Sequence, residues 1–169
     1  MQPVEVATGL ALSVSFEDFY EIEHRDLFGA MCLITGNRHD AEELMQEAFV
    51  KIWERWDLVQ GLQNPTGYLY RTAMNTFRMR YRRAKTAARK VARAVTRSDA
   101  LDAFETRVEV DRGLAMLTPR QRAAVVLTDL LGFSYAEAAD TLHVKPVTVR
   151  KLVSQGRETL RGVIGGVDA

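Results

Sequence analysis

The sequence predicts an all-α protein with two small helical domains joined by a flexible linker. Apolar residues recur at helical spacing on both sides of a charged segment in which that periodicity is weak. Proline and capping residues mark the starts of several of these helical segments. With 169 residues, 47% of them hydrophobic, the chain is long enough for two modest cores. We expect a flexible tail at 1–13, a first domain at 14–83, a linker at 84–104 and a second domain at 105–165.

The first domain begins with two apolar patterns of helical period. Between residues 16 and 34 apolar side chains recur roughly at helical spacing up to Gly36, which predicts one or two helices. From Ala41 to Trp56 they form one continuous stripe, opposite a face rich in glutamate. We therefore expect one long helix there, with Trp53 and Trp56 in the core.

A basic, aromatic-rich helix is predicted next. Asn64 followed by Pro65 offers a helix cap and a proline at the first helical position, and the pattern runs to about Arg83. Tyrosine and phenylalanine side chains are interleaved there with arginines. Because aromatic rings stack on unpaired bases and arginines neutralise phosphates, this helix is a candidate for contact with nucleic acid.

Charge is distributed unevenly along a chain whose formal net charge is only +1. Residues 1–77 hold 5 Lys/Arg and 12 Asp/Glu, residues 78–97 hold 9 Lys/Arg and no acid, and residues 98–169 hold 9 and 10. Such asymmetry indicates two kinds of partner surface. The basic block would add a salt-sensitive, sequence-independent affinity for phosphates.

The second domain is marked by two capping boxes. Thr118 with Gln121 opens one helix, and Ser134 with Glu137 opens a shorter one that ends near Leu142. In both, the first residue can accept from the backbone of the helix while the fourth residue bonds back to the first. These signals locate the start of each helix to within a few residues.

A helix-turn-helix is predicted at the end of the chain. The short second helix is followed by a turn at 143–145 and by Pro146, which starts a helix running to about Ile164. In this motif the second helix enters the major groove, so hydrogen-bond donors are needed near its start. A merely solvated helix face would carry the same residue types. The candidate donors are Lys145, Thr148, Arg150, Lys151, Ser154, Gln155 and Arg157.

Several function classes are disfavoured by composition. No apolar run approaches the roughly 20 residues of a membrane span, and the N-terminus lacks the basic lead of a signal peptide, so we expect a cytoplasmic protein. One cysteine, Cys32, and three dispersed histidines offer no metal-ligand spacing. We expect no cofactor, no metal and no catalytic set, and therefore not an enzyme.

Three segments together resemble one protein family. They are DAEELMQEAFVKIWERW, NPTGYLYRTAMNTFRMRYRR and LTPRQRAAVVLTDLLGFSYAEAADTLHVKPVTVRKL. In this order and separation they resemble a bacterial RNA polymerase sigma factor of the extracytoplasmic-function (ECF) group. The resemblance covers about residues 14–83 and 107–164 and implies sigma region 2 in the first domain and sigma region 4, with the helix-turn-helix, in the second. It also implies an alternative sigma factor that recognises and helps to melt promoters when bound to core RNA polymerase.

The resemblance implies roles for three groups of residues. The clamp coiled coil of core polymerase would be bound through Asp40, Glu43, Leu44, Gln46 and Glu47. The loop from Asp57 to Gln63 and the helix after it would capture a flipped base of the minus-10 element and hold the melted strand, through Asn64, Arg71, Asn75, Arg78, Arg82 and Arg83. The minus-35 element would be read as duplex by the donors of the last helix. The polymerase flap and an anti-sigma factor are further implied partners.

The sequence departs from the usual family pattern at Tyr68, Met79, Lys151, Leu152 and Gly156. A glycine inside the last helix costs about 1 kcal/mol relative to the alanine that is common there. These departures concern the promoter sequence that is recognised rather than the class of protein.

Two other functions fit the residues taken alone. A DNA-binding regulator would use the helix-turn-helix by itself, with the N-terminal half for dimerisation or sensing, and would bind paired half-sites. An adaptor that binds no DNA would use its acidic helix for a basic partner and its basic block for RNA. Binding to core polymerase discriminates both from a sigma factor.

Overall fold

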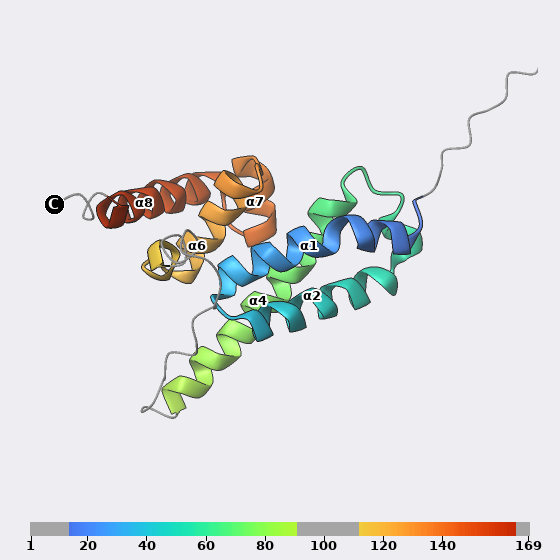
Figure 1. Cartoon of the computed structure of the whole chain (residues 1–169), viewed down its shortest axis with the longest axis horizontal. Coiled ribbons are helices and arrows are strands. Elements are labelled where there is room, and N and C mark those ends of the chain that lie inside the picture. Colours follow the sequence, from blue (N-terminus) through green and yellow to red (C-terminus); the bar gives the residue numbers. More distant parts are fainter. Residues whose placement is uncertain (1–13, 91–111, 165–169) are drawn as a thin grey trace, which may run out of the picture.

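The computed structural model describes residues 14–90 and 112–164, and every regular element in those two ranges is helical (Figure 1). We call them the N-terminal half and the C-terminal half. The all-α prediction is confirmed. The predicted tail at 1–13 and most of the predicted linker lie outside the described residues.

The N-terminal half contains three long helices and one short one. Helix α1 packs on α2, and α2 packs on α4. The bounds are α1 (Phe16–Thr35), α2 (Arg38–Trp53), α3 (Trp56–Val59) and α4 (Pro65–Lys90).

Helix α1 is bounded by two local signals. The hydroxyl of Ser15 accepts from the backbone N–H of Asp18 at 3.1 Å, which caps the first turn. At the other end Gly36 takes the left-handed conformation, with φ 68°, and its N–H donates to the Cys32 carbonyl. The segment predicted as one or two helices is therefore one.

An aromatic cluster joins the first three helices at one end of the N-terminal half. The rings of Phe19 and Trp56 lie 5.2 Å apart, and Tyr20 meets Phe49 edge-on at 4.7 Å. Phe16 completes the cluster at 5.6 Å from Trp56. Such pairs contribute about 0.5–1.5 kcal/mol each beyond the burial of their area.

Four sequence expectations in this half are wrong. The apolar stripe does not continue from Ala41 to Trp56 in one helix, because α2 ends at Trp53 and the chain turns before α3. Trp56 packs on the core, but Trp53 is 63% exposed. The segment from Asp57 to Gln63 is not wholly a loop, since it contains most of α3, and the basic helix continues past residue 83 to the end of α4.

The C-terminal half confirms both predicted capping boxes. The hydroxyls of Thr118 and Ser134 accept from the backbone N–H groups of Gln121 and Glu137, and both reciprocal side-chain bonds are present. The first helix widens into a π-helical turn, which the sequence pattern does not predict, before Gly132 ends it with φ 71°. The bounds are α6 (Pro119–Val125), the π-helix η1 (Val126–Leu130), α7 (Tyr135–Leu142) and α8 (Pro146–Ile164).

Helices α7 and α8 form the predicted helix-turn-helix. His143 reverses the chain in the left-handed conformation, with φ 52°. Val149 and Val153 are buried on the inner face of α8. Gly156 is buried too, at the crossing of α8 with α6, where a Cβ atom would lie 2.8 Å from Cγ2 of Val125. The two helices cross too closely there for a methyl group.

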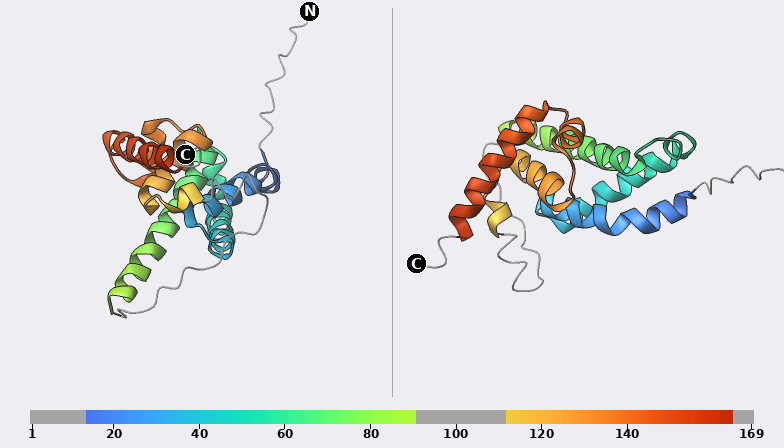
Figure 2. Two further views of the ribbon diagram at one scale, coloured as in Figure 1. Left: turned by 60° about the vertical axis from the view of Figure 1, so that its left-hand side comes forward. Right: turned by 90° about the horizontal axis from the view of Figure 1, so that it is seen from above.

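The two halves pack against each other (Figures 1 and 2), chiefly through α4 and α7. Tyr70 of α4 and Ala139 of α7 are buried in the same apolar cluster. From α6, Arg122 donates through Nη1 to the Ile34 carbonyl of α1 at 3.4 Å and through Nε to the Leu114 carbonyl at 2.8 Å. Most of the C-terminal core thus belongs to one cluster shared with the N-terminal half, rather than to a separate core.

The close crossing of α6 and α8 predicts an unusual effect of a glycine substitution. We expect Gly156→Ala to lower the free energy of unfolding by about 1 kcal/mol, because overpacking costs about 1–3 kcal/mol and exceeds the helix-propensity gain of about 1 kcal/mol. In a Val125→Ala background the same substitution should become stabilising. Urea unfolding of both variants measures the two effects.

The matched control for this prediction is Gly162→Ala on the same helix, where no atom lies within 4 Å of the added Cβ. That variant should be more stable than the parent protein by up to about 1 kcal/mol. Equal gains from Gly156→Ala and Gly162→Ala would contradict the packing argument.

Candidate nucleic-acid and protein interfaces

The outer face of α8 is the first candidate interface. Its inner face is buried on α6 and α7, so the opposite face is left to solvent. Thr148 is half-buried, whereas the other predicted minus-35 residues are exposed: Lys145, Arg150, Lys151, Ser154, Gln155 and Arg157. The structure thus brings most of the predicted donors to one surface.

Two of these arginines already have partners within the C-terminal half. Arg157 makes a bidentate pair with Asp129 of η1, with N–O distances of 2.9 and 2.7 Å. The hydrogen bond from Arg157 holds the pKa of the Asp129 carboxyl below its usual value. Arg150 lies over the ring of Tyr135, 5.6 Å from its centroid. Both guanidinium groups are thus oriented by side chains of the C-terminal half.

One face of α4 is the second candidate interface. Arg71, Asn75, Arg78 and Arg82 are spaced four, three and four residues apart, so they share a helix face. Arg71 lies over the ring of Tyr68 at 5.2 Å. Of the other predicted minus-10 residues, Asn64 caps the helix through a 2.7 Å bond from the Gly67 N–H, and Arg83 is exposed.

This face of α4 is turned toward the C-terminal half. Asn75 Oδ1 lies 2.6 Å from Nε2 of His143, the residue in the turn of the helix-turn-helix. One turn earlier, Tyr70 meets Phe133 edge-on, with ring centroids 5.3 Å apart. The predicted minus-10 surface therefore lies partly at the contact between the halves, whereas Asn64, Arg82 and Arg83 are exposed.

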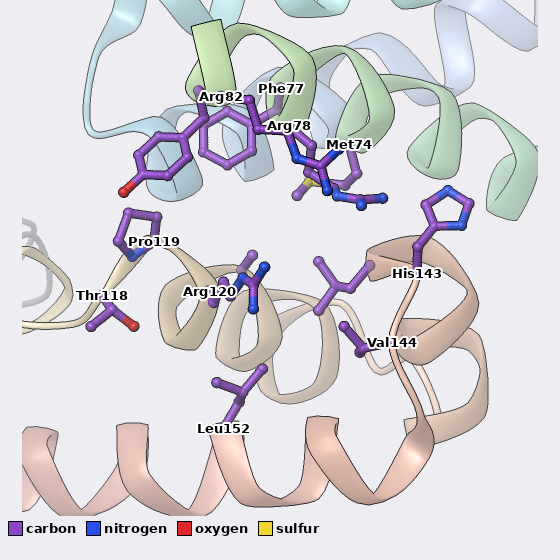
Figure 3. A pocket seen from close by; sticks show the side chains of 13 residues that line it. Met74, Phe77, Arg78, Arg82, Thr118, Pro119, Arg120, His143, Val144 and Leu152 are labelled. Carbon is purple, nitrogen blue, oxygen red and sulfur yellow. The ribbon is translucent and has the colours of Figure 1, made fainter. Parts of the chain in front are cut away.

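Two clefts flank the contact between Asn75 and His143. The larger, the arginine cleft, has a volume of about 710 Å³ and lies between α4, α6, the turn and α8 (Figure 3). Arg78 and Arg82 of α4 and Arg120 of α6 line it. Burial, and then these two neighbouring cations, lowers the pKa of Arg78. The smaller, the loop cleft, is about 420 Å³ and lies between residues 62–71 and one side of α7.

The loop cleft places acids opposite the predicted base-capture segment. Its N-terminal lining includes Asn64, Tyr68 and Arg71, whereas α7 contributes Glu137 and Asp140. Carboxylates repel phosphates, so this cleft in the packed arrangement is poorly suited to a nucleic-acid strand.

The exposed face of α2 is the third candidate interface. Asp40, Glu43 and Gln46 are exposed and Glu47 is half-buried, as a docking surface requires. Leu44 is only 1% exposed, so its side chain packs in the core and cannot touch a partner. Its inclusion among the contact residues is wrong, because the helix stripe places it on the inner face.

The acids of α2 are partly neutralised within the chain. Arg80 of α4 donates to Glu43 at 2.7 Å and to Glu47 at 2.9 Å, and Lys51 donates to Glu47 at 2.7 Å. The hydrogen bond from Lys51, followed by that from Arg80, lowers the pKa of Glu47. Because these side chains are more than a third exposed, the pairs orient the acids more than they stabilise the fold.

Sequence analysis missed an apolar part of this surface. Val50 and Trp53 are 54% and 63% exposed, and they follow Gln46 by four and seven residues on the same helix face. The signal was available in that spacing, but the aromatic stripe favoured a core position for Trp53. An exposed tryptophan beside oriented acids is typical of a protein-binding surface.

Two searches of the described residues concern other kinds of site. Within residues 14–90 and 112–164 no group of three or more His, Cys, Asp or Glu side chains is arranged to hold a metal ion. None of the helices in those ranges is long and apolar enough to span a membrane.

Comparison with known families matches both halves of the chain. The family model for Sigma-70 region 2 matches residues 19–87, and that for Sigma-70 region 4 matches residues 107–160. The chain therefore belongs to the sigma-70 family, with region 2 in its N-terminal part and region 4 in its C-terminal part. Curated relatives of the chain are named ECF RNA polymerase sigma factors.

Two curated relatives represent that group. The ECF RNA polymerase sigma factor SigE of Mycolicibacterium smegmatis is 35% identical over 167 residues, which cover 92% of this chain and 64% of the relative. SigM of Mycobacterium tuberculosis is 29% identical over 154 residues, covering 89% of this chain and 78% of the relative. The chain thus spans just under two thirds of the length of SigE.

Two solved structures share the fold. The sigma factor RpoE in complex with the anti-sigma factor NepR from Bartonella quintana superposes with a TM-score of 0.78 at 22% identity, covering 89% of this chain and 96% of that one. CnrH in complex with the cytosolic domain of CnrY gives 0.62 at 21% identity, covering 89% and 88%.

The contact between the halves predicts a variant with a more open shape. Phe133→Ala combined with His143→Gly removes an aromatic pair and a hydrogen bond, about 2 kcal/mol together, and glycine keeps the left-handed backbone at position 143. That loss raises the ratio of open to packed molecules about thirtyfold. Small-angle X-ray scattering should show a larger radius of gyration.

The control for this variant is Leu130→Ala, which removes a side chain that is 63% exposed. It should leave the scattering profile unchanged. An unchanged profile for the Phe133/His143 double variant would mean that these side chains do not hold the halves together.

Proposed function

We propose that this chain is an alternative sigma factor that binds core RNA polymerase, recognises the minus-35 and minus-10 elements and helps to melt the promoter. The observation that carries the proposal is that one chain presents three surfaces of different chemistry. An exposed recognition helix, a cationic helix face with aromatic neighbours and an acidic, apolar docking surface occupy α8, α4 and α2. Membership of the sigma-70 family supports the proposal. The chain has no reaction of its own in this proposal.

Helix α8 would read the minus-35 element as duplex. Its inner face holds it rigidly on α6 and α7, while its exposed face presents donors of the kind that recognise base edges in the major groove. Lys145 and Lys151 are exposed and available for phosphates or bases. Arg157, already paired with Asp129, would act at the edge of the contact, on a phosphate.

Helix α4 would hold the melted minus-10 strand. Unpaired bases need a stacking surface and their phosphates need cations, and the α4 face offers Tyr68, Arg71, Arg78 and Arg82. Because Asn75 is bonded to His143 and the acids of α7 face the loop cleft, the strand would enter only after the halves separate. Separation would also allow α8 and α4 to reach two elements of one promoter.

The exposed face of α2 would dock on the clamp coiled coil of core polymerase. Its acids would meet basic side chains, while Val50 and Trp53 would supply the apolar centre that such interfaces need. Region 4 would contact the flap. An anti-sigma factor is a further proposed partner, since the structural neighbour RpoE is in complex with the anti-sigma factor NepR. A protein with these partners would act in the bacterial cytoplasm.

The test of the proposal is single-round transcription by purified, sigma-free core polymerase on sheared genomic DNA, with and without this protein. We expect new RNA 5′ ends that share two upstream motifs, which would also define the promoter. Failure to bind core polymerase would overturn the proposal. Specific duplex binding in the absence of polymerase would then favour a stand-alone regulator.

The docking surface on α2 predicts a strong effect of one substitution. Trp53→Ala should weaken binding to core polymerase about thirtyfold, because a central tryptophan in an interface typically contributes 2 kcal/mol or more. Fluorescence-detected titration of labelled protein with core polymerase measures the dissociation constant. The midpoint of thermal unfolding should not fall, since Trp53 is largely exposed.

Ile22→Ala is the matched control, because Ile22 is an equally exposed apolar residue, at 66%, on α1. It should bind core polymerase as the parent protein does. Equal affinity of the Trp53 variant would move the docking surface away from α2.

A further inference from the structure

An aliphatic side chain occupies the centre of the DNA-facing surface of α8. Val147 is the second residue of the helix and is 66% exposed. Lys151 and Ser154 follow it by four and seven residues and are exposed on the same helix face. Val147 therefore lies in the first turn, in the middle of the stripe that faces away from the protein core.

Packing does not account for a valine at this position. The apolar contacts of α8 are made by its opposite face, where Val149 and Val153 are 0% and 1% exposed. Valine also has a lower helix propensity than alanine or the polar residues common on helix surfaces. An exposed valine is ordinary on most surfaces, but here it stands among side chains that bear hydrogen-bond donors.

The chemistry of the major groove identifies what such a side chain can recognise. Each base edge presents donors and acceptors, and the only apolar group among them is the C5-methyl of thymine. In a helix-turn-helix the first turn of the second helix is the part that meets base edges. A branched aliphatic side chain there contacts a methyl group and offers nothing to the polar edge of cytosine or guanine.

We propose that Val147 is a specificity-determining residue that recognises a thymine of the minus-35 element by packing against its methyl group. This inference rests on the proposed function and refines it. The cations around Val147 set affinity and register, while Val147 selects thymine at one base pair. Arg150 and Arg157, the two arginines of this helix face, already have partners in Tyr135 and Asp129.

The experiment removes the methyl group from either side of the contact. Holoenzyme formed with the full chain is used to select minus-35 duplexes from a random pool, and each thymine of the selected element is then replaced by deoxyuridine, which lacks only the methyl. At one thymine we expect binding by the parent protein to fall about fourfold, the worth of one buried methyl group. The Val147→Ala holoenzyme should lose affinity for the unmodified duplex and show no further loss with deoxyuridine.

Val147→Thr is the matched variant, because threonine has nearly the same shape and keeps one methyl group. It should retain part of the deoxyuridine effect. Unfolding measurements should show no loss of stability in either variant, since the residue is exposed.

The outcomes separate this inference from the proposed function. Promoter selection by the holoenzyme without a deoxyuridine effect that depends on residue 147 would overturn the inference and leave the sigma function intact. A selected element without thymine would overturn it as well, as would a Val147→Ala loss that is the same on thymine and deoxyuridine. Absence of any promoter selection would overturn both.

Discussion

The architecture depends on helix α4, because both halves of the described chain pack on it. One side of α4 completes the core with α2, and another packs on α7. Asn75 on this side is bonded to His143, and Arg78 and Arg82 line the arginine cleft, although their chemistry suits a nucleic-acid strand. If α4 binds DNA as proposed, the same surface would have two competing uses, because the packed C-terminal half would have to leave Asn75 before a strand could reach it.

The contact between the halves is mixed in composition. It combines an apolar seam around Tyr70 and Phe133 with the Asn75–His143 bond and the Arg122 bonds to carbonyl groups. Alongside the seam, Arg78, Arg82 and Arg120 line one cleft, where like charges oppose close packing. A partner that supplies anions, whether a DNA strand or an acidic protein segment, would relieve that repulsion and so favour its own binding.

Arginine has several distinct roles in this chain, and only the surroundings of each side chain separate them. Arg122 is half-buried and donates to the carbonyl groups of Ile34 in α1 and of Leu114. Arg80 orients the acids of α2, and Arg157 is paired with Asp129. Arg71 and Arg150 lie over aromatic rings. The residue type alone indicates a phosphate ligand in each case, but most of these side chains already have a partner within the fold.

The sequence by itself determined the local structure. The Asn64–Pro65 start, the capping boxes at Thr118 and Ser134 and the end of α1 at Gly36 were predicted, because these signals act over three or four residues. The helix-turn-helix followed from them. The resemblance also assigned most of the surfaces that the exposed residues of α2 and α8 now present.

Only the tertiary structure decided which of these residues are available to a partner. The exposure of Trp53 and the engagement of Asn75 by His143 depend on where helices end and what they pack against. In the sequence Trp53 and Trp56 fall on one apolar stripe of helical spacing. In the structure a turn of the chain between α2 and α3 separates the two residues, so they no longer share a helix face. The close crossing at Gly156 and the central place of Val147 likewise exist only once α8 is packed on α6 and α7.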